Sequence, residues 1–129
     1  MRVWVEGWQL EDGAELFSVG SEVEWGLVPL QGNDKVWLSR PLGAEAVESI
    51  THFETHHRPA ALQPQPVMTR GRVTSITAVH YELAQVDEHV LGEVPDSAVF
   101  EAREHAGHWE AEDWNYFMGG YIVELEPLD

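Results

Sequence analysis

The clearest structural pattern in the sequence is the run Val67-Met68-Thr69-Arg70-Gly71-Arg72-Val73-Thr74-Ser75-Ile76-Thr77-Ala78-Val79-His80-Tyr81-Glu82-Leu83. It is rich in β-branched residues, and its side chains alternate between two faces. One face is formed by Val73, Thr77, Val79, Tyr81 and Leu83, and the other by Arg72, Thr74, Ile76 and His80. A period of two residues predicts a long β-strand. Gly71, near its start, predicts a bend or bulge of the kind that barrel corners need.

The same alternation recurs along the chain and predicts about six strands, at residues 2–10, 17–27, 47–56, 67–83, 97–103 and 120–126. Within residues 17–27, Gly20 is expected to form a turn, after which Val23, Trp25 and Leu27 face inward. In the first of these, Val3 and Val5 face one side and Trp4 faces the other, which is typical of a strand covered on both faces. The pattern predicts a mainly β fold: a small antiparallel β-barrel or a strongly curved sheet, with one short helix. The connections are expected to include residues 84–96, residues 104–115 and a turn at Gly119-Gly120.

The one short helix is expected at residues 33–42. Asn33 or Asp34 can cap its first turn, and Pro41 with Gly43 ends it.

The segment that follows is open to two interpretations. Val47, Ile50 and Phe53 recur every three residues, which favours a helix. The β-branched and aromatic residues near the end of the segment favour a strand instead. We expect a strand over residues 47–56.

Length and composition predict a single β-barrel-like domain over residues 1–129. This length is near the most common domain size, and six Trp, four Phe and three Tyr supply large pieces of buried area. The chain has no cysteine, which excludes disulfides, thiolate metal sites and cysteine nucleophiles. It also lacks a Gly-x-Ser-x-Gly motif and a Gly-rich phosphate loop. No apolar run is long enough for a signal peptide or a membrane span, so we expect a cytoplasmic protein without a membrane partner.

The charge of the chain narrows the range of partners. Acidic residues outnumber basic ones by 23 to 7, and the formal net charge is −16. Such a field repels nucleic-acid phosphates, so no nucleic-acid partner is expected. It attracts cations and basic proteins, although acidity can also serve solubility alone. The expected partners are a basic protein, a divalent metal, or a second copy of the chain in a homodimer formed through an aromatic strand face.

The candidate metal ligands lie in one segment, Thr51-His52-Phe53-Glu54-Thr55-His56-His57. On a strand, His52, Glu54 and His56 point to one face and His57 points to the other. Two imidazoles and a carboxylate can hold a divalent transition metal. A strand spreads the three side chains over about 13 Å at ~3.3 Å per residue, so a single ion would also need a bend or another ligand. If the segment is instead a helix, His52 and His56 lie one turn apart, a spacing that suits zinc better. The simpler interpretation is that there is no metal site and that His56-His57 begins a polar loop.

Five segments also carry a resemblance. They are Met1-Arg2-Val3-Trp4-Val5-Glu6-Gly7-Trp8-Gln9-Leu10, Phe17-Ser18-Val19-Gly20 with Val23 and Trp25, His56-His57, Arg70-Gly71-Arg72-Val73 and Gly120-Tyr121-Ile122-Val123-Glu124-Leu125. Together they resemble a family of small, uncharacterised actinobacterial proteins. The resemblance implies a free-standing cytoplasmic protein and transfers no functional residue to this chain.

Two functional hypotheses follow. The leading one is a non-enzymatic binding module for a protein or a small ligand, with no catalytic residue assigned. The alternative is a divalent-metal-binding protein or metalloenzyme that uses His52, Glu54 and His56. A further ligand would be His57 or a histidine of the second His-containing loop, His105 or His108.

Overall fold

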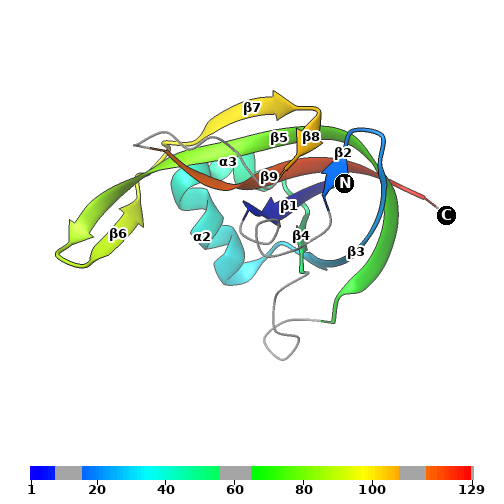
Figure 1. Ribbon diagram of the computed structural model, residues 1–129. Coiled ribbons are helices and arrows are strands. Elements are labelled where there is room, and N and C mark those ends of the chain that lie inside the picture. The colour runs from blue at the N-terminus through cyan, green and yellow to red at the C-terminus, as the bar shows by residue number, and fades with distance from the viewer. Residues whose placement is uncertain (8–15, 56–64, 108–115, 129) are drawn as a thin grey trace.

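The computed structural model describes residues 1–7, 16–55, 65–107 and 116–128, and Figure 1 shows their arrangement. Two consecutive helices are described, α2 (Gly32–Leu42) and α3 (Ala44–Glu48). The described strands are β1 (Arg2–Glu6), β2 (Phe17–Ser18), β3 (Glu22–Pro29), β4 (His52–Glu54), β5 (Val67–Asp87), β6 (Val90–Glu93), β7 (Val99–Arg103), β8 (His105–Ala106) and β9 (Tyr116–Pro127). The fold is mainly β, as predicted.

Seven of these strands form one strongly curved mixed sheet. Its order is β3-β4-β1-β9-β5-β6, and β7 pairs with β5. Because β5 also pairs with β3, the hydrogen-bonded path returns to its first strand, while β6 and β7 lie along β5 outside this circuit. The β1–β4 pair is parallel, and the other described pairs are antiparallel. The curved-sheet form of the prediction is confirmed; the parallel pair and the second helix were not predicted.

The long strand β5 organises the sheet because it pairs with four other strands. Its first part pairs with β3, its middle with β9 and β7, and its end with β6. Gly71 lies where both edges of β5 are paired, opposite Val23 and Pro127. An added Cβ at Gly71 would lie 2.5 Å from Leu125 Cγ, so this position requires glycine for the close approach of β9.

Two register shifts in the β5–β9 pair change which residues share a face. They lie between Val73 and Ser75 and between Val79 and His80. Val73 and Ile76 belong to one core cluster, whereas Val79 belongs to the other. The predicted faces of this strand were wrong here because strict alternation assumes a strand without bulges.

Each face of the sheet buries its own core cluster. The first core cluster includes Val3, Val5, Phe17, Leu27, Val73, Ile76, Tyr121, Val123 and Leu125. The second core cluster joins sheet residues to helix residues, namely Trp4, Val28, Phe53, Val79 and Ile122 with Leu38, Leu42 and Val47. Helices α2 and α3 therefore cover the second face (Figure 1). The prediction that Trp4 points away from Val3 and Val5 is confirmed.

Helix α2 matches the predicted range, but its caps differ. Gln31 is the N-cap, and its side chain makes no capping hydrogen bond. Asp34 lies in the first turn, where its carboxylate interacts favourably with the positive end of the helix dipole. Gly43, with φ of 88°, ends the helix as predicted, and its N–H donates to the Ser39 carbonyl. Neither described helix is long and apolar enough to cross a membrane.

Four segments depart from the sequence-based assignment. Helix α3 (Ala44–Glu48) takes the place of the first part of the strand predicted at 47–56. Among the described residues of that range, which end at Thr55, only His52–Glu54 form a strand. Residues 84–96, predicted as a connection, hold the end of β5 and all of β6. His105–Ala106 is a short strand within the predicted loop, and Gly119 and Gly120 lie inside β9 instead of in a turn.

Candidate functional site

Strand β4 places His52 and Glu54 on the same face of the sheet, as the strand hypothesis predicts. His52 lies opposite Val3 of β1, and Glu54 lies opposite Leu27 of β3. Because directly paired residues point to the same side, both face the first core cluster. Phe53 points to the second core cluster. Glu54 is buried, and His52 is half-buried.

The surroundings of His52 favour a neutral imidazole. Its Nδ1 lies 2.8 Å from Thr51 Oγ1. Burial, and then the positive charge of the Met1 amino group, lowers the pKa of His52 below its usual value. A neutral imidazole can ligate a metal, but the neighbouring positive charge repels a divalent cation. A hydrogen-bonding role fits this environment better than metal ligation.

The structure brings together two of the four predicted metal ligands. His56 and His57 lie outside the described residues. Among the residues that are described, no group of three His, Asp or Glu side chains could hold a metal ion. His52 and Glu54 therefore share a face without forming a site by themselves.

A cleft that the sequence did not indicate lies between helix α3 and the strands β1, β5, β7 and β9. It consists of two hollows of about 600 and about 520 Å³, and both are lined by Arg2 and Ser49. The larger hollow, called here the apolar hollow, is also lined by Leu42, Ala46, Phe100 and Ile122. The smaller, polar hollow is also lined by Thr51, Thr74, Glu124 and Glu126. Each volume falls in the range of small-molecule sites, roughly 300–1,000 Å³. We call the two hollows together the Arg2 cleft.

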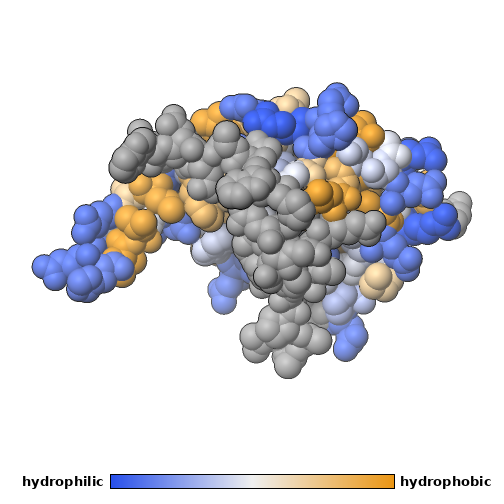
Figure 2. All heavy atoms as spheres, viewed as in Figure 1, coloured by the Kyte–Doolittle hydropathy of each residue, from blue (hydrophilic) through white to orange (hydrophobic). Residues whose placement is uncertain are grey.

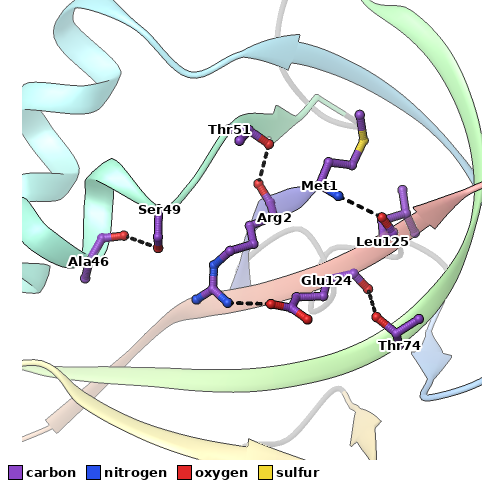
Figure 3. A network of polar contacts seen from close by, with 8 residues as sticks. All are labelled: Met1, Arg2, Ala46, Ser49, Thr51, Thr74, Glu124 and Leu125. Carbon is purple, nitrogen blue, oxygen red and sulfur yellow. Dashed lines mark hydrogen bonds and ion pairs between the residues drawn. The ribbon is translucent and has the colours of Figure 1, made fainter.

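A network of polar contacts holds Arg2 in this cleft (Figure 3). Arg2 Nη1 donates to Glu124 Oε1 at 2.8 Å. The Arg2 carbonyl accepts from the Thr51 backbone N–H at 2.9 Å and from Thr51 Oγ1 at 3.1 Å. On β9, the Glu124 carbonyl accepts from Thr74 Oγ1 at 3.3 Å. The Thr51 contacts hold the Arg2 backbone, and the contact with Glu124 is the one that holds its guanidinium.

One atom of the Arg2 side chain is left unsatisfied. Arg2 Nε is buried and has no hydrogen-bond partner among the described residues. A buried donor on a charged group is rarely left unpaired in a folded protein, because burying it without a partner is unfavourable. Arg2 is therefore the functional candidate in this cleft. The sequence gives no sign of this role, because Arg2 is a single arginine in an alternating strand.

The structure also joins a serine to a histidine. Ser18 Oγ lies 2.7 Å from His105 Nδ1 across the β2–β8 pair, on an exposed surface. A serine nucleophile needs donors for the oxyanion as well as a base. The backbone N–H groups of residues 18–21 are already bonded within the protein, to Ser21 Oγ and to carbonyls of Glu104, Val73 and Ser18. We therefore assign the contact between Ser18 and His105 a structural role, in which it helps to hold β2 against β8, and not a catalytic one.

Tyr81 is a second titratable residue with a shifted pKa. Burial raises the pKa of the Tyr81 phenol, and the carboxylates of Glu6 and Glu93 raise it further. Its ring packs on Phe117, with centroids 5.6 Å apart. A phenol with a raised pKa stays protonated at neutral pH, so Tyr81 serves packing instead of proton abstraction.

A ribbon of two strands extends beyond the rest of the sheet. This ribbon, residues 83–93, consists of the end of β5 and all of β6, and we call it the arm (Figure 1). Val90 and Leu91 on it are 50% and 64% exposed. The arm also carries Asp87, Glu88 and Glu93 and no Lys or Arg. Figure 2 shows a hydrophobic patch on it next to a hydrophilic tip.

The fold and these surfaces define a β-rich protein whose curved mixed sheet is covered on one face by two helices and bordered by a cleft. The chain belongs to a family of unknown function, DUF6578, whose model matches residues 1–127. The expected resemblance to an uncharacterised family is thereby confirmed. Neither the curated proteins nor the solved structures contain a match to the chain.

Proposed function

We propose that this protein is a non-enzymatic binding module that docks a basic, partly apolar surface of another protein through its arm. The observation that supports the proposal is the exposure of Val90 and Leu91 beside Asp87, Glu88 and Glu93 on a ribbon that leaves the body of the protein (Figures 1 and 2).

The arm is suited to pairing with another chain. A two-stranded ribbon with little else packed on it is only marginally stable in water. Among the described residues β6 pairs with β5 alone, so its outer edge can accept a further strand. Burying Leu91 and Val90 against a partner would contribute roughly 25 cal/mol for each Å² of apolar surface removed from water. Pairing would therefore stabilise both the arm and the complex.

The charge of the arm selects the partner. A second copy of this chain would bring one acidic arm, and a formal net charge of −16, against another. A basic protein meets the same surface with opposite charge, which raises the association rate and disfavours wrong partners. The proposal therefore commits to a basic protein; a homodimer is the outcome that would contradict it.

Site-specific photo-crosslinking tests the proposal in the cells that express the protein. A photoreactive side chain is placed at position 91 of the arm and, as a matched control, at position 36 of α2, where Val36 is 70% exposed. We expect crosslinking to a basic protein from position 91 alone, and we expect it to weaken in 0.5 M NaCl and in the Glu88→Lys variant. Equal products from both positions, or a product that contains only this chain, would show that the arm does not dock a basic protein.

A metal site built on His52, Glu54, His56 and His57 is the second candidate function. It is supported by the shared face of His52 and Glu54 on β4. Elemental analysis of tag-free protein incubated with zinc, manganese or iron(II) tests it. Stoichiometric metal that is lost in His52→Ala and His56→Ala, but retained in His105→Ala, is the expected result. Metal-free protein under all three conditions ends the hypothesis.

A further inference from the structure

We infer that the Arg2 cleft binds a small organic monocarboxylate with an apolar body. The carboxylate is accepted by the free edge of the Arg2 guanidinium, formed by Nε and Nη2, and the body lies in the apolar hollow. This site is separate from the arm and does not depend on the function proposed for it.

One edge of the guanidinium is anchored, and the other has an unpaired donor. Nη1 donates to Glu124 at 2.8 Å, and Nε, on the opposite edge, is buried without a hydrogen-bond partner among the described residues. Because the side chain as a whole is 37% exposed, it can turn this edge, formed by Nε and Nη2, toward a ligand. This is the edge with which arginine makes two parallel hydrogen bonds to a carboxylate. Figure 3 shows Glu124 on one side of the guanidinium and Ser49 and Ala46 toward the other. This edge therefore faces the side of the hollow that Ala46 and Ser49 line, and a ligand reaches Nε when the Arg2 side chain turns toward the hollow.

The hollow beside this edge has walls for an apolar body. Leu42 and Ala46 come from the helices, and Phe100 and Ile122 come from β7 and β9. Phe100 is 44% exposed, although aromatic side chains gain most from burial. A ligand in the hollow would cover Phe100 and provide the acceptor that Arg2 Nε lacks. Arg2, Glu45, Ser49 and Thr77 complete the lining, and a combination of apolar walls with a few polar groups is typical of small-molecule sites.

The surrounding charge favours a single carboxylate over a phosphate. Glu45 lines the apolar hollow, and Glu124 and Glu126 line the polar hollow. Arg2 lines both, and it already offsets Glu124. A phosphate dianion would bring a second negative charge into an acidic surface, whereas a monocarboxylate brings the one charge that the guanidinium edge can hold.

The test uses protein-observed NMR with three probes: 3-phenylpropionate, its neutral match 3-phenylpropionamide, and inorganic phosphate. We expect saturable shifts at the amides of Ser49, Thr77 and Phe100 with the carboxylate at millimolar concentration. The amide and phosphate should bind at least tenfold more weakly. Equal binding of the carboxylate and the amide, tighter binding of phosphate, or shifts that map elsewhere would overturn the assignment.

Variants separate recognition by Arg2 from a general role in folding. Arg2→Gln should weaken carboxylate binding at least tenfold, and Arg2→Lys should restore it only in part because lysine lacks the fork. Glu124→Gln should tighten binding, since it removes the competing carboxylate. Arg40→Gln, on α2 outside the cleft, is the control that keeps the wild-type affinity. If Arg2→Gln does not fold, the Glu124→Gln and Phe100→Ala variants still decide: unchanged affinity in both contradicts the inference.

Discussion

Three glycines allow strands of the sheet to approach more closely than other residues would permit. At Gly119, an added Cβ would enter the ring of Tyr81. At Gly120, it would meet the Val5 carbonyl oxygen and lie 2.7 Å from Trp4 Cζ2. At Gly71, the obstacle is the Leu125 side chain. A side chain can shift more readily than a backbone carbonyl, so Gly120 is expected to be the least replaceable of the three.

The Gly120→Ala substitution tests this expectation. The methyl group would push against the backbone of β1, and overpacking of this kind costs about 1–3 kcal/mol of the free energy of unfolding. Urea denaturation of the variant and the wild type measures the difference. Ala102→Ser, at an exposed position of β7, is the control and should change the free energy of unfolding little. Equal stability of Gly120→Ala and the wild type would show that β1 and β9 can separate without cost.

His52 should make the stability of the fold depend on pH. Burial and the Met1 amino group lower its pKa from the ordinary value of 6.5. As pH falls below 6.5, the unfolded chain therefore binds a proton at His52 before the folded protein does, and the folded state loses stability until its own, lower pKa is passed. The contribution of His52 is fully present above pH 6.5.

The His52→Gln variant isolates this contribution from that of the many carboxylates. Its free energy of unfolding should fall less steeply than that of the wild type between pH 6.5 and pH 5. Parallel pH profiles for the two proteins would contradict the assignment. Titration of the His52 ring by NMR, compared with the ordinary histidine pKa of 6.5, checks the direction of the pKa shift directly.

At the scale of elements, the arm differs from the rest of the sheet in the support it receives. β5 pairs with β9 over most of its length, but beyond Glu82 the described pairing of β5 is with β6 alone. Segments with few buried contacts open locally at much lower free energy than core strands. We therefore expect amide hydrogens of β6 to exchange about a hundredfold or more faster than those of Ile122 and Val123, relative to their intrinsic rates. Equal protection would mean that the arm unfolds only with the whole domain.

Local patterns in the sequence predict the strands better than the connections. Alternation finds β1, β5 and β9 because their side chains are buried on opposite faces, and the Pro41–Gly43 signal finds the end of α2. The same alternation assigns wrong faces in β5, because the bulge beyond Val73 depends on pairing with β9. The arm was missed because its polar sequence resembles a loop, and β6 is held by hydrogen bonds to β5 instead of by a core.

How well each candidate site could be predicted depends on whether its residues are close together in the sequence. His52 and Glu54 are two residues apart in one strand, so their shared face follows from the sequence. The Arg2 cleft combines residues from β1, α2, α3, β5, β7 and β9, which only the tertiary fold brings together. Its most informative feature, the unsatisfied Arg2 Nε, is a property of the surroundings and has no counterpart in the sequence.

At the scale of the whole molecule, the formal net charge of −16 should limit stability through repulsion among carboxylates. The described ion pairs are on partly or fully exposed side chains, such as Arg2–Glu124 and Lys35–Glu48, and such pairs contribute little each. Salt screens both effects, and with 23 acidic against 7 basic residues the repulsion is the larger.

Added salt should therefore raise the melting temperature. Between 10 mM and 300 mM NaCl at pH 7 we expect an increase of several degrees, since the Debye length falls from about 30 Å at 0.01 M to below 8 Å above physiological ionic strength. Differential scanning calorimetry measures it. Magnesium chloride at matched ionic strength distinguishes screening from a specific site: equal shifts indicate screening, whereas a much larger magnesium shift indicates a bound cation. A melting temperature that falls with NaCl would mean that the ion pairs, and not the carboxylate repulsion, dominate the electrostatic energy of this fold.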